Sequence, residues 1–318
     1  MKKGIVLAIA WLTILAVSAT WGSVSAAEFP TRPIEVVLPN APGGGMDFVM
    51  TLFKKYAEKD IKQPILLTFK PGGGGTIGNV YAKALKPDGY SLVSESPSSL
   101  LLSYMTRKNA GYVMDDFSPI CNLTIIPQVY CVKDDSPYKT MKQWIEAAKT
   151  KKMQYATFGQ FSTSHIVIES LGKIAGFQAT HIPYKGAAAA MTATLGGHAD
   201  IAGAATTAFV GPGKLRLLAV ASEKRLERYP DVPTLMELGY PINGLEYYSI
   251  WGPKNVPDEI ADRLHAIFEK AYTQNKAEMT KIAAEQDHVI SVLNRKELRA
   301  AYQERYEFFT KFLADYKL

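Results

Sequence analysis

The sequence predicts an α/β protein of two lobes that is made with an export signal. Strands alternate with amphipathic helices over residues 33–95, and the same alternation returns over residues 140–222. An apolar run that follows two lysines begins the chain. The length of 318 residues suits one large domain or two of ordinary size. With 47% hydrophobic and 21% charged residues, the composition is that of a globular protein.

The first residues have the pattern of a secretory signal peptide. Lys2 and Lys3 precede the apolar run "GIVLAIAWLTILAV", and small residues follow at Ala26 and Ala27. The alternative is a membrane anchor, but the run is short for a span of about 20 residues. We therefore expect a signal peptide over residues 1–27, cut near Ala26-Ala27, and a mature protein that is exported to the periplasm.

The first α/β region begins with the strand "IEVVLPN" and continues with "PILLTF" and "YSLVSE". Between them, Val49, Leu52, Phe53 and Tyr56 fall at helical spacing, and residues 77–85 repeat that spacing. Strand–helix–strand units of this kind are parallel and right-handed, so the loops after the strands share one edge of the sheet. Ligands of open α/β sheets bind at that edge.

The second region repeats the arrangement. We expect a helix over 140–149, strands at 153–158, 179–184, 199–205 and 215–222, and helices at 166–176 and 187–197. Segments near 129–135 and 247–253 are expected to cross between the lobes, and helices over 257–274, 276–285 and 295–315 to return to the first lobe. The predicted lobes are 28–127 plus 253–318, and 128–252.

Two glycine-rich loops stand between a strand and a helix, "APGGGMD" at 41–47 and "PGGGGTIG" at 71–78. The first N–H groups of a helix have no partner within it, and the helix dipole places partial positive charge there. Glycines let an oxygen of a ligand approach the backbone closely. The two loops therefore predict an anion site built from backbone N–H groups.

The pattern favours a carboxylate over a nucleotide. The second loop lacks the Lys-Ser/Thr pair of a phosphate-binding loop, and Phe48 stands where a dinucleotide loop has its last glycine. Lysines and arginines form no cluster interleaved with aromatics, and no His, Cys, Asp and Glu grouping has metal-ligand spacing. We expect no cofactor, no metal and no nucleic acid partner.

Several polar residues have two readings that the sequence leaves open. Asp47 and Thr76 either cap the helices that follow or contact the ligand. The same holds for Ser162 and Thr163 in the loop "GQFSTSH", while Thr206 and Thr207 end a strand at the ligand edge or form a simple turn. His165 beside a serine is also compatible with a hydrolase, but no nucleophile elbow accompanies it.

The two cysteines, Cys121 and Cys131, do not make a disulfide framework. If one strand contains both, they lie ~33 Å apart and cannot pair. A turn at Pro127 would bring them together. We favour two buried thiols.

Four stretches carry a family resemblance: "FPTRPIEVVLPNAPGGGMD", "PGGGGTIG" with "LKPDGYSLV", "HIPYKGAAAAMTATLGGHADI" and "LLAVASEKRLERYPDVPTLMELGYP". Through nearly the whole mature length the chain resembles substrate-binding proteins of tripartite tricarboxylate transporters, also called Bug or TctC-like receptors. The resemblance implies a type II-like periplasmic-binding-protein fold that closes on a ligand. It also implies that the glycine loops hold a ligand carboxylate like a pincer.

The resemblance and the loop positions together assign the ligand contacts. They are Pro42, Gly43, Gly44, Gly45, Met46, Asp47, Gly73, Gly74, Gly75, Thr76, Ser96, Ser98, Gly159, Phe161, Ser162, Thr163, His165, Thr206 and Thr207. Met46, the "SESPSSL" turn and the "IAGAATTAF" segment depart from the family pattern. The resemblance therefore does not indicate which acid this protein binds.

The function that this implies is a monomeric periplasmic receptor, not an enzyme. It would carry a di- or tricarboxylic, amino or aromatic acid to membrane permease subunits. The alternatives are a receptor that feeds a sensor kinase, and an exported Ser/His hydrolase.

Overall fold

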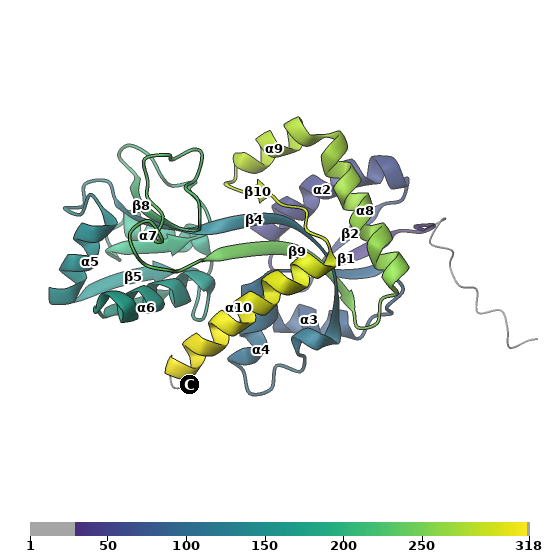
Figure 1. Ribbon diagram of the computed structural model, residues 1–318, viewed down its shortest axis with the longest axis horizontal. Coiled ribbons are helices and arrows are strands. Elements are labelled where there is room, and N and C mark those ends of the chain that lie inside the picture. The colour runs from purple at the N-terminus through teal and green to yellow at the C-terminus, as the bar shows by residue number, and fades with distance from the viewer. Residues whose placement is uncertain (1–28, 317–318) are drawn as a thin grey trace, which may run out of the picture.

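The computed structural model of the chain describes residues 29–316 (Figure 1). The predicted signal peptide, residues 1–27, lies outside the described residues. Within the described part, no helix is both long and apolar enough to span a membrane. The strands join in one sheet with the order β2-β1-β3-β9-β4-β7-β5-β6, and β8 and β10 pair with β4. This sheet connects two α/β lobes, as predicted.

Lobe 1 contains the first predicted strand–helix–strand units. Strands β1 (Ile34–Leu38), β2 (Ile65–Phe69) and β3 (Ser91–Glu95) are parallel, with β1 in the middle. Helix α2 (Gly45–Ile61) follows the first glycine loop, and α3 (Thr76–Lys83) follows the second. The apolar stripe of α2 packs in the lobe 1 core together with α8 (Asp258–Gln274). The predicted order and direction of these elements are confirmed.

Lobe 2 has the same construction. Strand β5 (Met153–Thr157) lies between β6 (Ala179–Pro183) and β7 (Ile201–Ala204), and all three are parallel. Helices α5 (Met141–Thr150), α6 (Thr163–Ala175) and α7 (Ala187–Leu195) cover them, and β8 (Leu215–Ala221) pairs antiparallel with β4. Trp144 and Tyr155 are fully buried in its core.

Two strands run side by side between the lobes (Figure 1). β4 (Phe117–Lys133) pairs with β9 (Leu245–Pro253) over residues 117–127, and with β7 and β8 over residues 128–133. The sequence indicated only the second half of β4, because Pro119, Pro127 and the buried polar residues Asn122 and Thr124 interrupt its apolar pattern. Cys121 and Cys131 are free, buried thiols on this one strand, as predicted.

The C-terminal helices α8, α9 (Lys276–Ala284) and α10 (Arg295–Tyr316) match the predicted ranges closely. The short strand β10 (Val289–Ile290) connects α9 to α10. On α10, Tyr302 and Phe309 are fully buried in one cluster with Trp251 of β9, so these aromatic side chains pack the helix onto the crossing strand. Helix α10 also contacts lobe 2, because Phe308 packs on its core.

The segment after β3, which contains most of the "SESPSSL" turn, is helical. Residues Ser98–Leu102 form a π-helical turn and Ser103–Met105 a short helix, α4. Leu100, Leu101 and Leu102 are buried there. Three consecutive leucines in the core hold the "SPSS" turn against lobe 1, which fixes the positions of its serines.

Candidate ligand site between the lobes

The two glycine loops lie next to each other on lobe 1. They follow β1 and β2, which are parallel neighbours, so both loops stand at the same sheet edge. Gly78 at the start of α3 packs directly on Pro39 after β1, since a Cβ at Gly78 would lie 2.8 Å from the Pro39 Cα. A side chain at residue 78 would push the loops apart. The last glycine of "PGGGGTIG" therefore serves packing between the loops.

The first loop presents an uncapped helix start. Gly44 is the residue before α2, and no side chain caps the helix there. The first backbone hydrogen bond of this end runs from the Phe48 N–H to the Gly44 carbonyl, 3.0 Å. The N–H groups of Gly45, Met46 and Asp47 precede that bond and have no acceptor within the helix. This arrangement suits an anion that approaches past Gly43 and Gly44.

Two predicted contacts of the first loop have structural roles. The Asp47 carboxylate accepts the Gly43 N–H at 2.8 Å and the Thr51 hydroxyl at 3.2 Å, so it folds the loop back onto α2. Met46 is 3% exposed and packs in the lobe 1 core, where its Sδ accepts from Asn40. Pro42, Gly43 and Gly44 are exposed at the rim.

The second loop is held by its own backbone conformation. Gly72, Gly73, Gly74 and Gly75 all have positive φ, at 131°, 58°, 61° and 99°. These are conformations that residues with a Cβ rarely adopt. Thr76 begins α3, and its hydroxyl donates to the Gly73 carbonyl at 2.8 Å. The run of four glycines is therefore required by the fold of the loop itself.

Side chains from the following segment surround this second loop. Arg107 donates from Nη1 to the Thr76 hydroxyl at 2.8 Å, and a Cβ at Gly74 would lie 3.0 Å from its Nη2. Ser103 donates to the Gly74 carbonyl. Arg107 thus places a permanent positive charge beside the loop. Sequence reasoning missed it because it lies thirty-one residues after Thr76 in a stretch without helical periodicity.

The Ser96–Ser99 turn brings lobe 1 against lobe 2. Ser98 Oγ lies 2.8 Å from the hydroxyl of Thr163, which begins α6 in lobe 2. Both hydroxyls also hydrogen-bond the same oxygen, Oε1 of Glu246 on β9. Ser96 is 6% exposed beside them. Two predicted contacts, Ser98 and Thr163, are therefore brought together by a glutamate that the sequence analysis did not single out.

Burial raises the pKa of two carboxylic acids, Glu246 and Glu95, near the place where the Ser96–Ser99 turn meets lobe 2. Glu246 is 3% exposed, and burial raises its pKa against the hydrogen bonds from Ser98 and Thr163. Glu95, at the end of β3, is fully buried, and burial raises its pKa to about 8. Nearby Glu246 raises it further by charge repulsion. Within residues 29–316, neither carboxyl forms an ion pair with a basic side chain.

The loop Gly159–His165 is held by stacked rings. His165 stacks on His181 with centroids 4.0 Å apart, and the Tyr155 ring lies against both, 4.9 Å from His181 and 6.1 Å from His165. Burial lowers the pKa of His165 to about 3 and that of His181 to about 4, so both rings are neutral. His165 Nδ1 accepts the Phe161 N–H at 3.1 Å. Phe161 has a left-handed backbone, φ 56°, and is partly buried.

Ser162 caps helix α6, which was one of the two roles that the sequence left open for it. Its hydroxyl accepts the His165 N–H and donates to the Gly159 carbonyl at 2.8 Å. The Nδ1 of His165 is occupied by Phe161 rather than by a serine hydroxyl. The geometry therefore gives no support to a Ser/His hydrolase.

A second contact between the lobes occupies Thr207. Its N–H and its hydroxyl both donate to Asp287 Oδ2, each at 2.6 Å. Asp287 follows α9 and also accepts from Arg228 of lobe 2 at 3.4 Å. The Thr206 hydroxyl accepts the Ala208 N–H at 3.1 Å, which makes a local turn. Asp287 was missed because only the tertiary fold brings it to residue 207.

Comparison with known proteins identifies the family. The family model described as "tripartite tricarboxylate transporter family receptor" matches residues 49–304. The chain belongs to this receptor family. A UPF0065 protein from the gbd 5′ region of Cupriavidus necator is 37% identical over 274 residues, 85% of this chain and 83% of the relative.

Solved structures give the same result. A TctC solute-binding protein from Polaromonas has a TM-score of 0.76 and 28% identity, and the match covers 90% of this chain and 99% of that one. MatC from Rhodopseudomonas palustris, described with bound malate, has a TM-score of 0.74 over 89% of this chain and 98% of its own, with 23% identity. The receptor thus has the two-lobe fold of periplasmic binding proteins.

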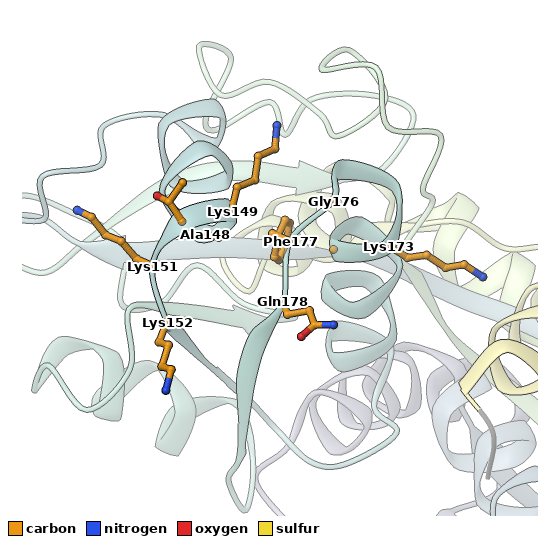
Figure 2. A pocket seen from close by; sticks show the side chains of 10 residues that line it. Ala148, Lys149, Lys151, Lys152, Lys173, Gly176, Phe177 and Gln178 are labelled. Atoms are coloured by element: carbon orange, nitrogen blue, oxygen red, sulfur yellow. The ribbon is translucent and has the colours of Figure 1, made fainter.

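Two described cavities of the receptor lie away from the junction. One, of about 610 Å³, is in lobe 2 between α5 and α6 (Figure 2). Lys149, Lys151, Lys152 and Lys173 line it, but their side chains point in different directions and do not converge on one point (Figure 2). The other, of about 550 Å³, is on lobe 1 and includes Arg107 and Lys83.

Tyr248 and His288 complete the surroundings of the first loop. A Cβ at Gly45 would lie 2.9 Å from the Tyr248 hydroxyl, so the crossing strand β9 contacts the start of α2. Tyr248 packs on His288 at 5.1 Å, and the Nδ1 of His288 is 3.0 Å from the Thr124 hydroxyl. Glu246 and Tyr248 lie two residues apart on β9 and share one face of the strand. Glu246 therefore lies on the side of β9 that faces the first glycine loop.

Proposed function

We propose that this receptor is a periplasmic solute-binding protein that captures a small carboxylate and delivers it to the permease subunits of a tripartite tricarboxylate-type transporter. The observation that carries the proposal is the uncapped start of α2 at Gly44, next to a second glycine loop with Arg107 at its side. Backbone N–H groups and a guanidinium are the donors that a carboxylate prefers.

The family membership supports this reading, because the family is named for receptors of tricarboxylate transporters. A protein of the same fold is described with bound malate, a dicarboxylate. We place the ligand carboxylate at Gly43–Met46 and Gly73–Thr76. The remaining contacts come from Ser96, Ser98, Gly159, Phe161, Thr163, His165, Thr206 and Thr207, where the lobes meet.

The lobe boundaries 28–127 plus 253–318, and 128–252, belong to the same proposal. β4 changes partners after Pro127, from β9 to β7 and β8, which supports a boundary there. Export with removal of residues 1–27 and action as a monomer complete it.

A panel of di- and tricarboxylic, amino and aromatic acids tests the proposal. The mature receptor is expected to gain thermal stability with at least one acid, because a ligand that binds only the folded state stabilises it. Calorimetry then gives the affinity, and product analysis checks that the acid is not converted. Turnover, or the absence of binding by every acid class, would contradict the proposal.

A further inference from the structure

The junction of Ser98, Thr163 and Glu246 joins three separate parts of the chain. Ser98 belongs to lobe 1, Thr163 begins α6 of lobe 2, and Glu246 is on the crossing strand β9. The boundary at residue 253 counts β9 with lobe 2, but Glu246 pairs with Ile126 in the lobe 1 half of β4, so it stays with Ser98. Separating the lobes would then break the contacts of Thr163 with both partners. The junction therefore exists only when the lobes are close together.

The three hydrogen bonds of this junction need one more hydrogen than the hydroxyls of Ser98 and Thr163 carry. Three oxygen atoms, Ser98 Oγ, Thr163 Oγ1 and Glu246 Oε1, make three mutual contacts. Each contact needs one hydrogen, and two hydroxyls carry two. If both hydroxyls donate to an ionised Glu246, the 2.8 Å contact between Ser98 and Thr163 has no hydrogen. A protonated Glu246 supplies the third hydrogen.

The surroundings of Glu246 favour the neutral acid. Its Oε2 is buried without a hydrogen-bond partner, and so is Oε1 of Glu95. The titratable groups electrostatically coupled to it are Glu95 on β3, Tyr248 on its own strand and Tyr302 on α10. None of these is a cation. An ionised Glu246 would therefore lie beside a second buried carboxyl with no opposite charge.

The hydrogen-bond donors around Glu246 act in the other direction. Thr163 is the first residue of α6, and the positive end of a helix favours an anion. The hydroxyls of Ser98, Thr163 and Ser96 and the backbone N–H of Ser98 also lower the pKa of Glu246. Burial is the larger effect, and the net direction is upward. In the open arrangement Glu246 loses the cover of lobe 2, so its pKa returns toward the ordinary value.

We infer that Glu246 is the positioning residue that locks the two lobes together around the ligand, and that it does so as the neutral acid, so that the receptor takes up one proton from solvent when it closes. The effect on ligand affinity rests on the proposed function, because it requires that the receptor bind an acid. The closure itself does not depend on a ligand being known. Glu95 stays buried within lobe 1 beside Asn79 and Ser99, so it is not the group that changes its exposure on closing.

The direction of the pH dependence follows. A carboxyl whose pKa is higher in the closed form favours closure at low pH, and this contribution is lost as pH rises through the raised pKa. Where the closed form holds the proton and the open form does not, the closing constant falls tenfold per pH unit. Acid ligands that bind the closed form lose affinity at the same rate.

Closure of the mature, ligand-free receptor is measured first, by small-angle scattering between pH 5 and pH 9. The wild type is expected to expand as pH rises. Glu246→Gln, which is always neutral and supplies N–H donors in place of the acid O–H, is expected to stay compact throughout. Glu169→Gln is the matched control, because Glu169 is a partly buried acid bonded to Tyr155 in lobe 2 and lies outside the junction. It should expand like the wild type.

Binding of the best acid from the panel is measured second. Calorimetry of the wild type in phosphate and in Tris should reveal uptake of about one proton, which Glu246→Gln should lack. A wild type that stays equally compact at every pH, or a Glu246→Gln variant that expands like it, would overturn the inference. If no acid binds but the scattering results hold, the proposed function fails and the lock stands.

Discussion

The two glycine loops of this receptor look alike in sequence and differ in the structure. Neither helix start has a side-chain cap, but in the first loop a Cβ at Gly44 would meet only the Ala41 carbonyl, at 3.7 Å. In the second, every glycine from Gly72 to Gly75 has positive φ, and Arg107, Ser103 and Ser99 crowd the loop. The backbone of the first loop is therefore open to close approach, whereas glycine in the second is first a requirement of folding.

The largest expected effect is a loss of unfolding free energy on substitution of a glycine in the second loop. Gly75→Ala should destabilise the receptor by about 2–4 kcal/mol, because φ is 99° and the new Cβ would lie 2.2 Å from the Ser99 Oγ. Urea unfolding at neutral pH measures it. A loss below about 0.5 kcal/mol would mean that the second loop is as adaptable as the first.

The second prediction reverses the pattern at the first loop. Gly44→Ala should leave the unfolding free energy within about 0.5 kcal/mol, because its backbone is extended, φ −89° and ψ 173°. The same methyl group blocks close approach to the α2 N–H groups, so affinity for the best acid should fall about tenfold, or ~1.4 kcal/mol. Calorimetry measures the affinity. Unchanged binding would remove the first loop from the site.

The third prediction uses pH to weaken the support of the second loop. Glu95 precedes the turn whose Ser99 contacts Gly75, and its pKa is raised to about 8. Its contribution to stability is complete below about pH 4.5 and is lost as pH rises through 8. Wild-type stability should fall by on the order of 1 kcal/mol per pH unit approaching pH 8, and less in Glu95→Gln. The exposed Glu237→Gln serves as the control, and should follow the wild type.

The smallest effect concerns the charge at the first loop. Asp47 accepts the Gly43 N–H, but its charge also opposes an anion at the same helix end. Asp47→Asn keeps an acceptor oxygen and removes the charge, so affinity for an acid should rise about two- to fivefold, and less at high salt. Asp60→Asn, the same change near the other end of α2, should leave affinity unchanged. Equal gains in both variants would indicate a general charge effect.

Much of the fold was predictable because the spacing of apolar residues along the chain indicates each helix and strand locally. The parallel units β1–α2–β2 and β5–α6–β6, and the helices α8 to α10, follow from apolar spacing and from turn residues. The first half of β4 was not predictable, because a strand with Pro119, Asn122 and Thr124 looks like a loop until β9 pairs with it. Its polar side chains are buried between elements that are distant in sequence.

By itself the sequence determined the α/β class, the order of the elements and the two glycine loops at one sheet edge, and it favoured two unpaired thiols. Only the tertiary structure decided what each glycine does and which side chains meet between the lobes. Glu246 meets Thr163 and Ser98 across 83 and 148 residues of chain, and Asp287 meets Thr207. Thr207 and Asp287 are the nearest of these in sequence, 80 residues apart. Such contacts leave no periodic signal, because a single polar residue gains its partner only when the lobes come together.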